Sequence, residues 1–102
     1  MTDIEIIRAL CIAKAMRWTN HIFVRLVERG ISIEDIENAI MTGEIIESYP
    51  KDYPTPSFLI SGLSVNSKKI HVVCGVGDEL HLITAYYPDI ITWTNDYTTR
   101  RG

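Results

Sequence analysis

The stretch that decides the fold runs from Lys68 to Tyr87 and reads KKIHVVCGVGDELHLITAYY. Two apolar runs rich in β-branched residues flank the pair Gly77-Asp78. A two-residue turn with glycine at its first central position is typical of a β-hairpin. The stretch therefore predicts two antiparallel strands joined at this pair.

This turn fixes the register of the predicted hairpin. It places His71 opposite Thr84, Val73 opposite Leu82 and Gly75 opposite Leu80. Cross-strand partners point to the same face of a sheet, and strand alternation adds Tyr86 to the face of His71. One end of this sheet face thus carries three polar side chains, those of His71, Thr84 and Tyr86. They form either a functional site or a partly solvated edge of the sheet.

The rest of the chain is helical first and extended later. Caps and apolar periodicity predict three helices, the second spanning about His21 to Arg29 and the third opening at Ser32. Two further strands precede the hairpin, at Glu44 to Tyr49 and Ser57 to Ser64. We expect an α+β fold in which about three N-terminal helices pack on a four-stranded antiparallel β-meander.

Composition places this chain among ordinary globular proteins. Its 102 residues are 46% hydrophobic and 23% charged, which predicts a single domain over residues 1–102. Two cysteines make no disulfide framework, and no apolar stretch is long enough to span a membrane. The acidic N-terminus lacks the basic region of a signal peptide. We therefore expect a soluble, cytoplasmic protein that binds no membrane.

Motifs for metal or cofactor chemistry are lacking in the sequence. The three histidines show no metal-binding spacing, and the predicted register puts His71 and His81 on opposite faces. Gly-x-Ser-x-Gly is absent, and Gly75-Val76-Gly77 is not followed by a helix, as a phosphate-binding loop would be. We expect no metal and no cofactor.

Metal-free cleavage of RNA needs only side chains that this chain carries. RNA supplies its own nucleophile, the 2′-hydroxyl, so an enzyme must move protons and stabilise the charge on phosphorus. His71 and Tyr86 are the candidate acid and base. Candidate cations and neighbouring polar groups come from the second helix and the C-terminal tail: His21, Arg25, Arg29 and Arg100. A solvated helix face and a structural histidine are the more common explanations of the same residues.

The order of these residues resembles a known family. His21, Arg25, Arg29-Gly-Ile-Ser, Gly43-Glu-Ile-Ile-Glu-x-Tyr49, Ile70-His-Val-Val, Ile83-Thr-Ala-Tyr86-x-Pro-Asp89, Trp93 and Arg100-Arg101 together look like the prokaryotic domain-of-unknown-function family 4258. That family is similar to RelE/barnase-like RNase toxins of type II toxin-antitoxin systems. The resemblance covers about residues 21–101.

The resemblance implies an mRNA-cleaving endoribonuclease toxin with a RelE/barnase-like fold. It implies RNA as the substrate, free or on the ribosome, and a small antitoxin protein as the partner. His21, Arg25, His71 and Tyr86 would be catalytic, with Arg29, Thr84 and Arg100 binding the substrate. The net charge of −3 disfavours binding of free RNA by electrostatic attraction alone. Cleavage of RNA on the ribosome is compatible with this charge.

A non-enzymatic interaction module is the first alternative, and a small-molecule-binding domain that uses the same cleft is the second. Both faces of the predicted hairpin are apolar, with Val73 and Leu82 on one and Val72 and Ile83 on the other. One face packs on the helices, and the second needs cover from the tail, a partner protein or a second copy in a homodimer. Covering the second face is thus a requirement of the fold whichever function applies.

Overall fold

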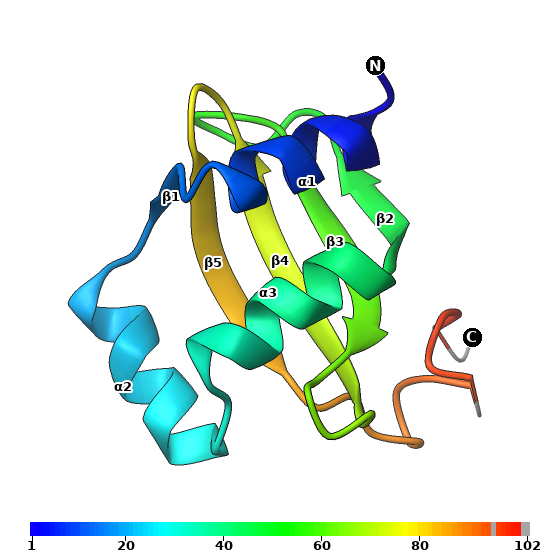
Figure 1. Ribbon diagram of the computed structural model, residues 1–102. Helices are drawn as coiled ribbons and strands as arrows, with labels where there is room; N and C mark the ends of the chain where they lie inside the picture. The colour runs from blue at the N-terminus through cyan, green and yellow to red at the C-terminus, as the bar shows by residue number, and fades with distance from the viewer. Residues whose placement is uncertain (95, 101–102) are drawn as a thin grey trace.

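The computed structural model describes residues 1–94 and 96–100 and has an α+β architecture. Three helices and a five-stranded mixed sheet make up the fold (Figure 1). Their bounds are α1 Asp3–Ile12, β1 Met16–Arg17, α2 Asn20–Arg29, α3 Ile33–Thr42, β2 Glu44–Tyr49, β3 Ser57–Leu63, β4 Lys69–Val76 and β5 Leu80–Tyr86.

Each helix begins at a side chain that caps its free amide groups. Thr2 and Glu5 form a capping box on α1, and Ser32 and Asp35 form the same motif on α3. Thr19 accepts a hydrogen bond from the amide of Ile22 at the start of α2. The predicted helices are confirmed because local capping signals mark their starts in the sequence.

The strand order of the sheet is β1-β5-β4-β3-β2. The four strands from β2 to β5 pair with their sequence neighbours in antiparallel fashion. The two-residue strand β1 adds to β5 in parallel, with Met16 opposite Leu80. The prediction of a purely antiparallel four-stranded sheet is therefore wrong, because a two-residue strand between two helices carries no periodic signal.

The predicted hairpin register is also wrong. The loop has three residues, Gly77 to Glu79, so that Gly75 pairs with His81. A bulge then leaves Ile83 unpaired, and beyond it Val73 pairs with Thr84 and His71 with Tyr86. Each one-residue shift moves side chains to the other face.

These two shifts have different consequences along β5. Between the loop and the bulge, only the shift caused by the three-residue loop applies. His81 therefore lies on the face of His71 rather than on the opposite face. Beyond the bulge the second shift cancels the first. His71, Thr84 and Tyr86 therefore share one face as predicted, although His71 faces Tyr86 and not Thr84.

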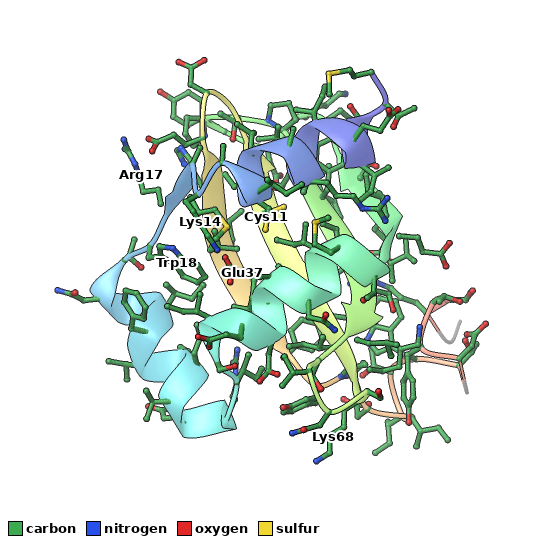
Figure 2. The ribbon with its side chains drawn as sticks, in the orientation of Figure 1. Cys11, Lys14, Arg17, Trp18, Glu37 and Lys68 are labelled. Carbon is green, nitrogen blue, oxygen red and sulfur yellow. The ribbon has the colours of Figure 1, made fainter. Side chains whose placement is uncertain are left out.

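The main hydrophobic core lies between the sheet and the helices α1 and α3, which cross one face of the sheet (Figure 1). Helix α3 packs so closely on β3 that a Cβ atom on Gly62 would lie 2.1 Å from the carbonyl oxygen of Ala39. Lys14, just after α1, forms an ion pair with Glu37 of α3, beside buried Cys11 (Figure 2). The helices thus fix one face of the sheet.

The other face of the sheet is covered in part by the segment after β5. We call residues 90–100 the tail, apart from position 95. Trp93 of the tail is 2% exposed although it stands outside the main core. Beneath the tail, His71 is 0% exposed, with the Trp93 ring packed on its imidazole. Of the three possible covers named for the second face, the tail is present and covers part of it.

Candidate functional site

Five polar side chains meet where the tail crosses the second face of the sheet. Glu47 and Tyr49 come from β2, His71 from β4, Tyr86 from β5 and Arg100 from the tail. We call this group the tail-side cluster. Strand pairing brings it together, since β2 to β5 lie side by side and alternate residues of each strand face the tail.

His71 holds the tail on the sheet. Its Nε2 atom lies 2.7 Å from the carbonyl oxygen of Tyr97, and its Nδ1 atom lies 3.3 Å from the hydroxyl of Tyr86. A carbonyl oxygen only accepts, so Nε2 carries the proton and Nδ1 accepts from Tyr86. The ring also packs edge-on to Trp93, with ring centres 4.5 Å apart. Every polar atom of this buried imidazole is occupied.

Glu47 and Arg100 form the accessible half of the cluster. Arg100 donates to both carboxylate oxygens of Glu47, at 2.7 and 3.2 Å, and Tyr49 donates its hydroxyl to the same carboxylate. The guanidinium lies over the ring of Trp93, 4.6 Å from its centre, as in a cation–π contact. The side chains of Glu47 and Arg100 remain 24% and 53% exposed. Solvent therefore reaches this pair but not His71.

The protonation states of the cluster follow from these contacts. The hydrogen bonds from Arg100 lower the pKa of Glu47, so the carboxylate is ionised at neutral pH. Burial lowers the pKa of His71 and keeps its imidazole neutral. Burial also raises the pKa of Tyr86, so its phenol stays protonated. The cluster thus holds a carboxylate, a guanidinium and a protonated phenol at neutral pH.

Acidification is expected to loosen the domain through His71. Burial holds the pKa of His71 in the folded protein below its ordinary value of 6.5. At about pH 6, the unfolded chain therefore binds a proton at this residue more readily than the folded protein does. The free energy of unfolding should fall as the pH drops below about 6.5, by at most about 1.4 kcal/mol per pH unit for this proton. Carboxylates with lowered pKa values, such as Glu47, respond only below about 4.5. Urea unfolding at about pH 7.5 and about pH 5.5 measures the difference.

Two variants sharpen that measurement. The chain has two tryptophans, so a Trp18→Phe variant makes Trp93 the sole indole fluorophore and a reporter of the tail. We expect its emission to shift to the red in the same pH range. A His71→Gln variant should lose this part of the pH dependence, and an unchanged pH slope in that variant would contradict the assignment.

The predicted residues of α2 are not part of the tail-side cluster. His21 and Arg25 are exposed, and no described residue is hydrogen-bonded or ion-paired to either side chain. Arg29 reaches β5, where it donates to Thr84 Oγ1 at 3.1 Å and to the carbonyl of Ala85 at 2.8 Å. In Figure 1, α2 lies beside β5, while the tail ends on the far side of the sheet. The predicted residues of α2 therefore lie apart from the tail-side cluster.

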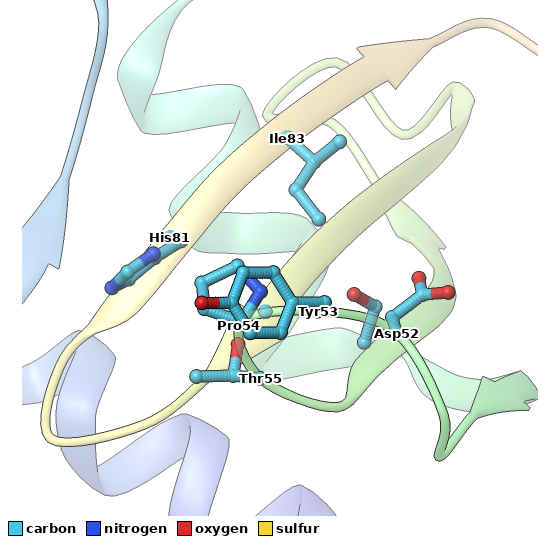
Figure 3. Close-up of a pocket in the computed structure, with 8 residues that line it drawn as sticks. Asp52, Tyr53, Pro54, Thr55, His81 and Ile83 are labelled. Atoms are coloured by element: carbon cyan, nitrogen blue, oxygen red, sulfur yellow. The ribbon is translucent and has the colours of Figure 1, made fainter.

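A second feature of the same sheet face is a hollow of about 450 Å³. Loop residues 52–55 form one side of it, and His81 and Ile83 of β5 form the other (Figure 3). Ser57 and Gly75 line it as well, and they are paired with each other across β3 and β4. The hollow is therefore adjacent to the tail-side cluster on the face that the helices leave free.

Sequence reasoning missed Glu47, Tyr49 and the hollow. A bulge between Ile45 and Glu47 puts Ile45 in the core and Glu47 on the opposite face, which strict alternation does not allow. The pairing of Glu47 with Arg100 depends on where the tail lies, which no local pattern encodes. Arg101, part of the sequence pattern noted above, falls outside the described residues.

A family model matches most of the chain. Residues 18–87 match the family described as a domain of unknown function (DUF4258), which covers α2 to β5 and excludes the tail. No curated protein and no solved structure matches the chain. Within the described residues, no helix is long and apolar enough to cross a membrane, and no three His, Cys, Asp or Glu residues gather as a metal site. The chain belongs to the DUF4258 family.

Proposed function

We propose that this protein is a metal-independent endoribonuclease whose chemistry resides in the tail-side cluster. One observation carries the proposal: a carboxylate, a guanidinium and a protonated phenol converge on the sheet face opposite the helices. Those are the groups needed to take a proton, stabilise a charged phosphorane and return a proton. The net charge of −3 makes a local site of this kind more important than a general attraction for RNA.

Each reacting group has a separate role in the proposed reaction. Glu47 accepts the proton of the 2′-hydroxyl, whose oxygen attacks the adjacent phosphorus. Arg100 binds the non-bridging oxygens, where negative charge grows. Tyr86 turns its hydroxyl away from Nδ1 of His71 and gives its proton to the departing 5′-oxygen as the phosphorus–oxygen bond breaks. The products are a 2′,3′-cyclic phosphate and a 5′-hydroxyl, and the base and acid regain their starting protonation from water.

His71 acts as a positioning residue in this proposal. Its Nδ1 atom holds the hydroxyl of Tyr86, and its Nε2–H holds the tail through Tyr97. A 0% exposed imidazole cannot touch a substrate without movement of the tail. This differs from the sequence prediction, in which His71 is itself an acid or base.

Without RNA, the charged groups of the tail-side cluster are hydrogen-bonded to one another. Glu47 already accepts hydrogen bonds from Arg100 and Tyr49. A phosphate group would compete with the carboxylate for Arg100, which frees Glu47 to act as a base. Exposed ion pairs of this type contribute only about 0–1 kcal/mol, so a bound phosphate can replace one at little cost.

The proposal extends to the biology that the sequence resemblance implies. An α+β domain with helices on one sheet face and an acid–base cluster on the other agrees with a RelE/barnase-like toxin. We propose that the chain acts in the cytoplasm on mRNA and is neutralised by a small antitoxin protein. The support is the resemblance together with the residue types of the cluster.

Induced expression in a bacterial host tests the proposed function. The wild type should stop growth and fragment mRNA, whereas an equally expressed Glu47→Gln variant should do neither. Glu44→Gln serves as the matched control, because Glu44 is an exposed residue at the start of the same strand. Intact mRNA with the wild type, or equal fragmentation by wild type and Glu47→Gln, would refute the proposal.

An interaction module is the second candidate function. The observation that favours it is a group of exposed apolar side chains on α2. Val24 and Val27, one turn apart, are 56% and 81% exposed, and Phe23 beside them is 39% exposed. A partner or second copy docked there would bury them. A monomer in light scattering, together with mRNA cleavage by the wild type, would remove this candidate.

A further inference from the structure

We propose that the hollow between loop residues 52–55 and β5 binds one base of single-stranded RNA and prefers guanine. This inference rests on the proposed function, because it gives the substrate of the tail-side cluster a recognition site. The hollow measures about 450 Å³ and is lined partly by Asp52, Tyr53, Thr55, His81 and Ile83. A flat nucleobase fits the lower part of the size range of small-ligand sites.

Tyr53 is the stacking surface of the hollow. Tyr53 is 96% exposed, so its ring is accessible to a ligand. Ile83, unpaired at the bulge of β5 and 50% exposed, adds an apolar surface on the opposite wall (Figure 3). Proteins bind unpaired bases by stacking them on such aromatic rings.

One wall of the hollow lies beside the proposed reaction centre. Tyr49 pairs with Ser57, which lines the hollow, and Glu47 lies two residues before Tyr49 on the same strand. Two residues of a strand span roughly 7 Å. His81 and Ile83 on the opposite wall belong to β5, three strands from β2, or roughly 14 Å. A single-stranded RNA with a phosphate at Arg100 can therefore place the base of that nucleotide or of the next one in the hollow.

The polar lining favours a base that donates hydrogen bonds. Asp52 presents a carboxylate, which only accepts, and Thr55 adds a hydroxyl that accepts as well. Guanine offers two adjacent donors on its Watson–Crick edge, N1–H and N2–H₂, whereas uracil offers one donor between two acceptors. Carboxylates read donor groups of bases in this way. Guanine is thus the base that this lining satisfies best.

Contacts with the sheet hold the loop in place. The amide of Val76 donates to the carbonyl of Pro56 at 2.9 Å, and the amide of Asp52 donates to the carbonyl of Tyr49 at 3.2 Å. A Cβ atom on Gly75 would lie 2.7 Å from Thr55 Oγ1, so the absence of a side chain at Gly75 lets the loop approach β4. The hollow is therefore formed before a ligand binds, which lowers the cost of ordering.

The experiment is an NMR titration of the full chain with short RNAs that cannot be cut. The probes are trinucleotides with 2′-O-methyl groups and the sequences AGA, AAA, ACA and AUA. We expect saturable shifts of the amide signals of Thr55, Gly75 and His81. AGA should bind at least about tenfold more tightly than AUA, a factor within the range known for a carboxylate–base contact.

Three variants assign the binding to the hollow. Tyr53→Ala should weaken every trinucleotide by about tenfold, within the range for loss of one base stack. Tyr53→Phe keeps the ring and should bind like the wild type. Asp52→Asn should remove most of the preference of AGA over AUA. Asp52 and Tyr53 are exposed, and the dispersion of the amide spectrum verifies that each variant is folded.

The outcomes separate this inference from the proposed function. Absence of saturable shifts at the hollow, equal affinity for all four trinucleotides, or unchanged binding by Tyr53→Ala would overturn the inference. RNA cleavage that depends on Glu47 but not on Tyr53 or Asp52 would leave the proposed function standing and remove the base site. Binding in the hollow by a chain that cuts no RNA would overturn the proposed function and leave the base site standing.

Discussion

Replacement of Glu47 by glutamine is expected to slow RNA cleavage by about 100- to 10,000-fold, the usual contribution of a general base. The substitution removes the charge that accepts the proton of the 2′-hydroxyl and keeps the size of the side chain. Arg100 and Tyr49 retain an oxygen atom to which they can donate. The rate constant under single-turnover conditions, with labelled RNA free or on ribosomes, measures the effect.

Stability and a matched carboxylate provide the controls for this result. The ion pair between Glu47 and Arg100 is partly exposed, so its loss should cost no more than about 1 kcal/mol in urea unfolding. Glu44→Gln, on the same strand, should cleave RNA at the wild-type rate. If both variants cleave equally well, Glu47 is not the base.

Replacement of Trp93 by alanine is expected to reduce the free energy of unfolding by about 3–5 kcal/mol, the usual range for a buried tryptophan. Trp93 is 2% exposed, packs against His71 and supports Arg100. Without its ring, water would reach His71, against which Trp93 now packs. Since small domains unfold at a cost of about 5–15 kcal/mol, this is a large share of the total.

RNA cleavage by Trp93→Ala shows whether Trp93 only stabilises the fold or also holds Arg100 in the site. Loss of the Trp93 ring should also free Arg100, so cleavage of RNA should fall even at temperatures where the variant is folded. Trp18→Phe is the comparison, because Trp18 stacks on Phe23 away from the tail and phenylalanine keeps that contact. A Trp93→Ala domain as stable as the wild type would contradict the buried position of the tail.

The fold could be predicted where local chemistry determines it. Helix starts follow from Thr2, Thr19 and Ser32, because a capping side chain acts within one turn. The sheet was predicted less well, since the loop at Gly77 and the bulge at Ile83 each add one residue. Strand register depends on such single residues, and their positions are fixed by packing rather than by composition.

The site could be predicted only in part for a related reason. His71 and Tyr86 share one face as predicted, because the shift at the loop and the shift at the bulge cancel there. The contact of Glu47 with Arg100 joins residues far apart in the chain and depends on the path of the tail. The residues of α2 looked like partners of His71 because helical spacing shows which side chains are neighbours but not which strand they face.

The chemistry of the cut ends tests the central claim most directly. After induction of the chain in a bacterial host, the ends of the mRNA fragments are mapped with ligases that distinguish a 5′-hydroxyl from a 5′-phosphate. A base, a cation and a phenol acting on the 2′-hydroxyl must leave a 2′,3′-cyclic phosphate and a 5′-hydroxyl, and these ends should be absent with Glu47→Gln. Fragments with a 5′-phosphate and a 3′-hydroxyl, or no fragments at all, would contradict the account.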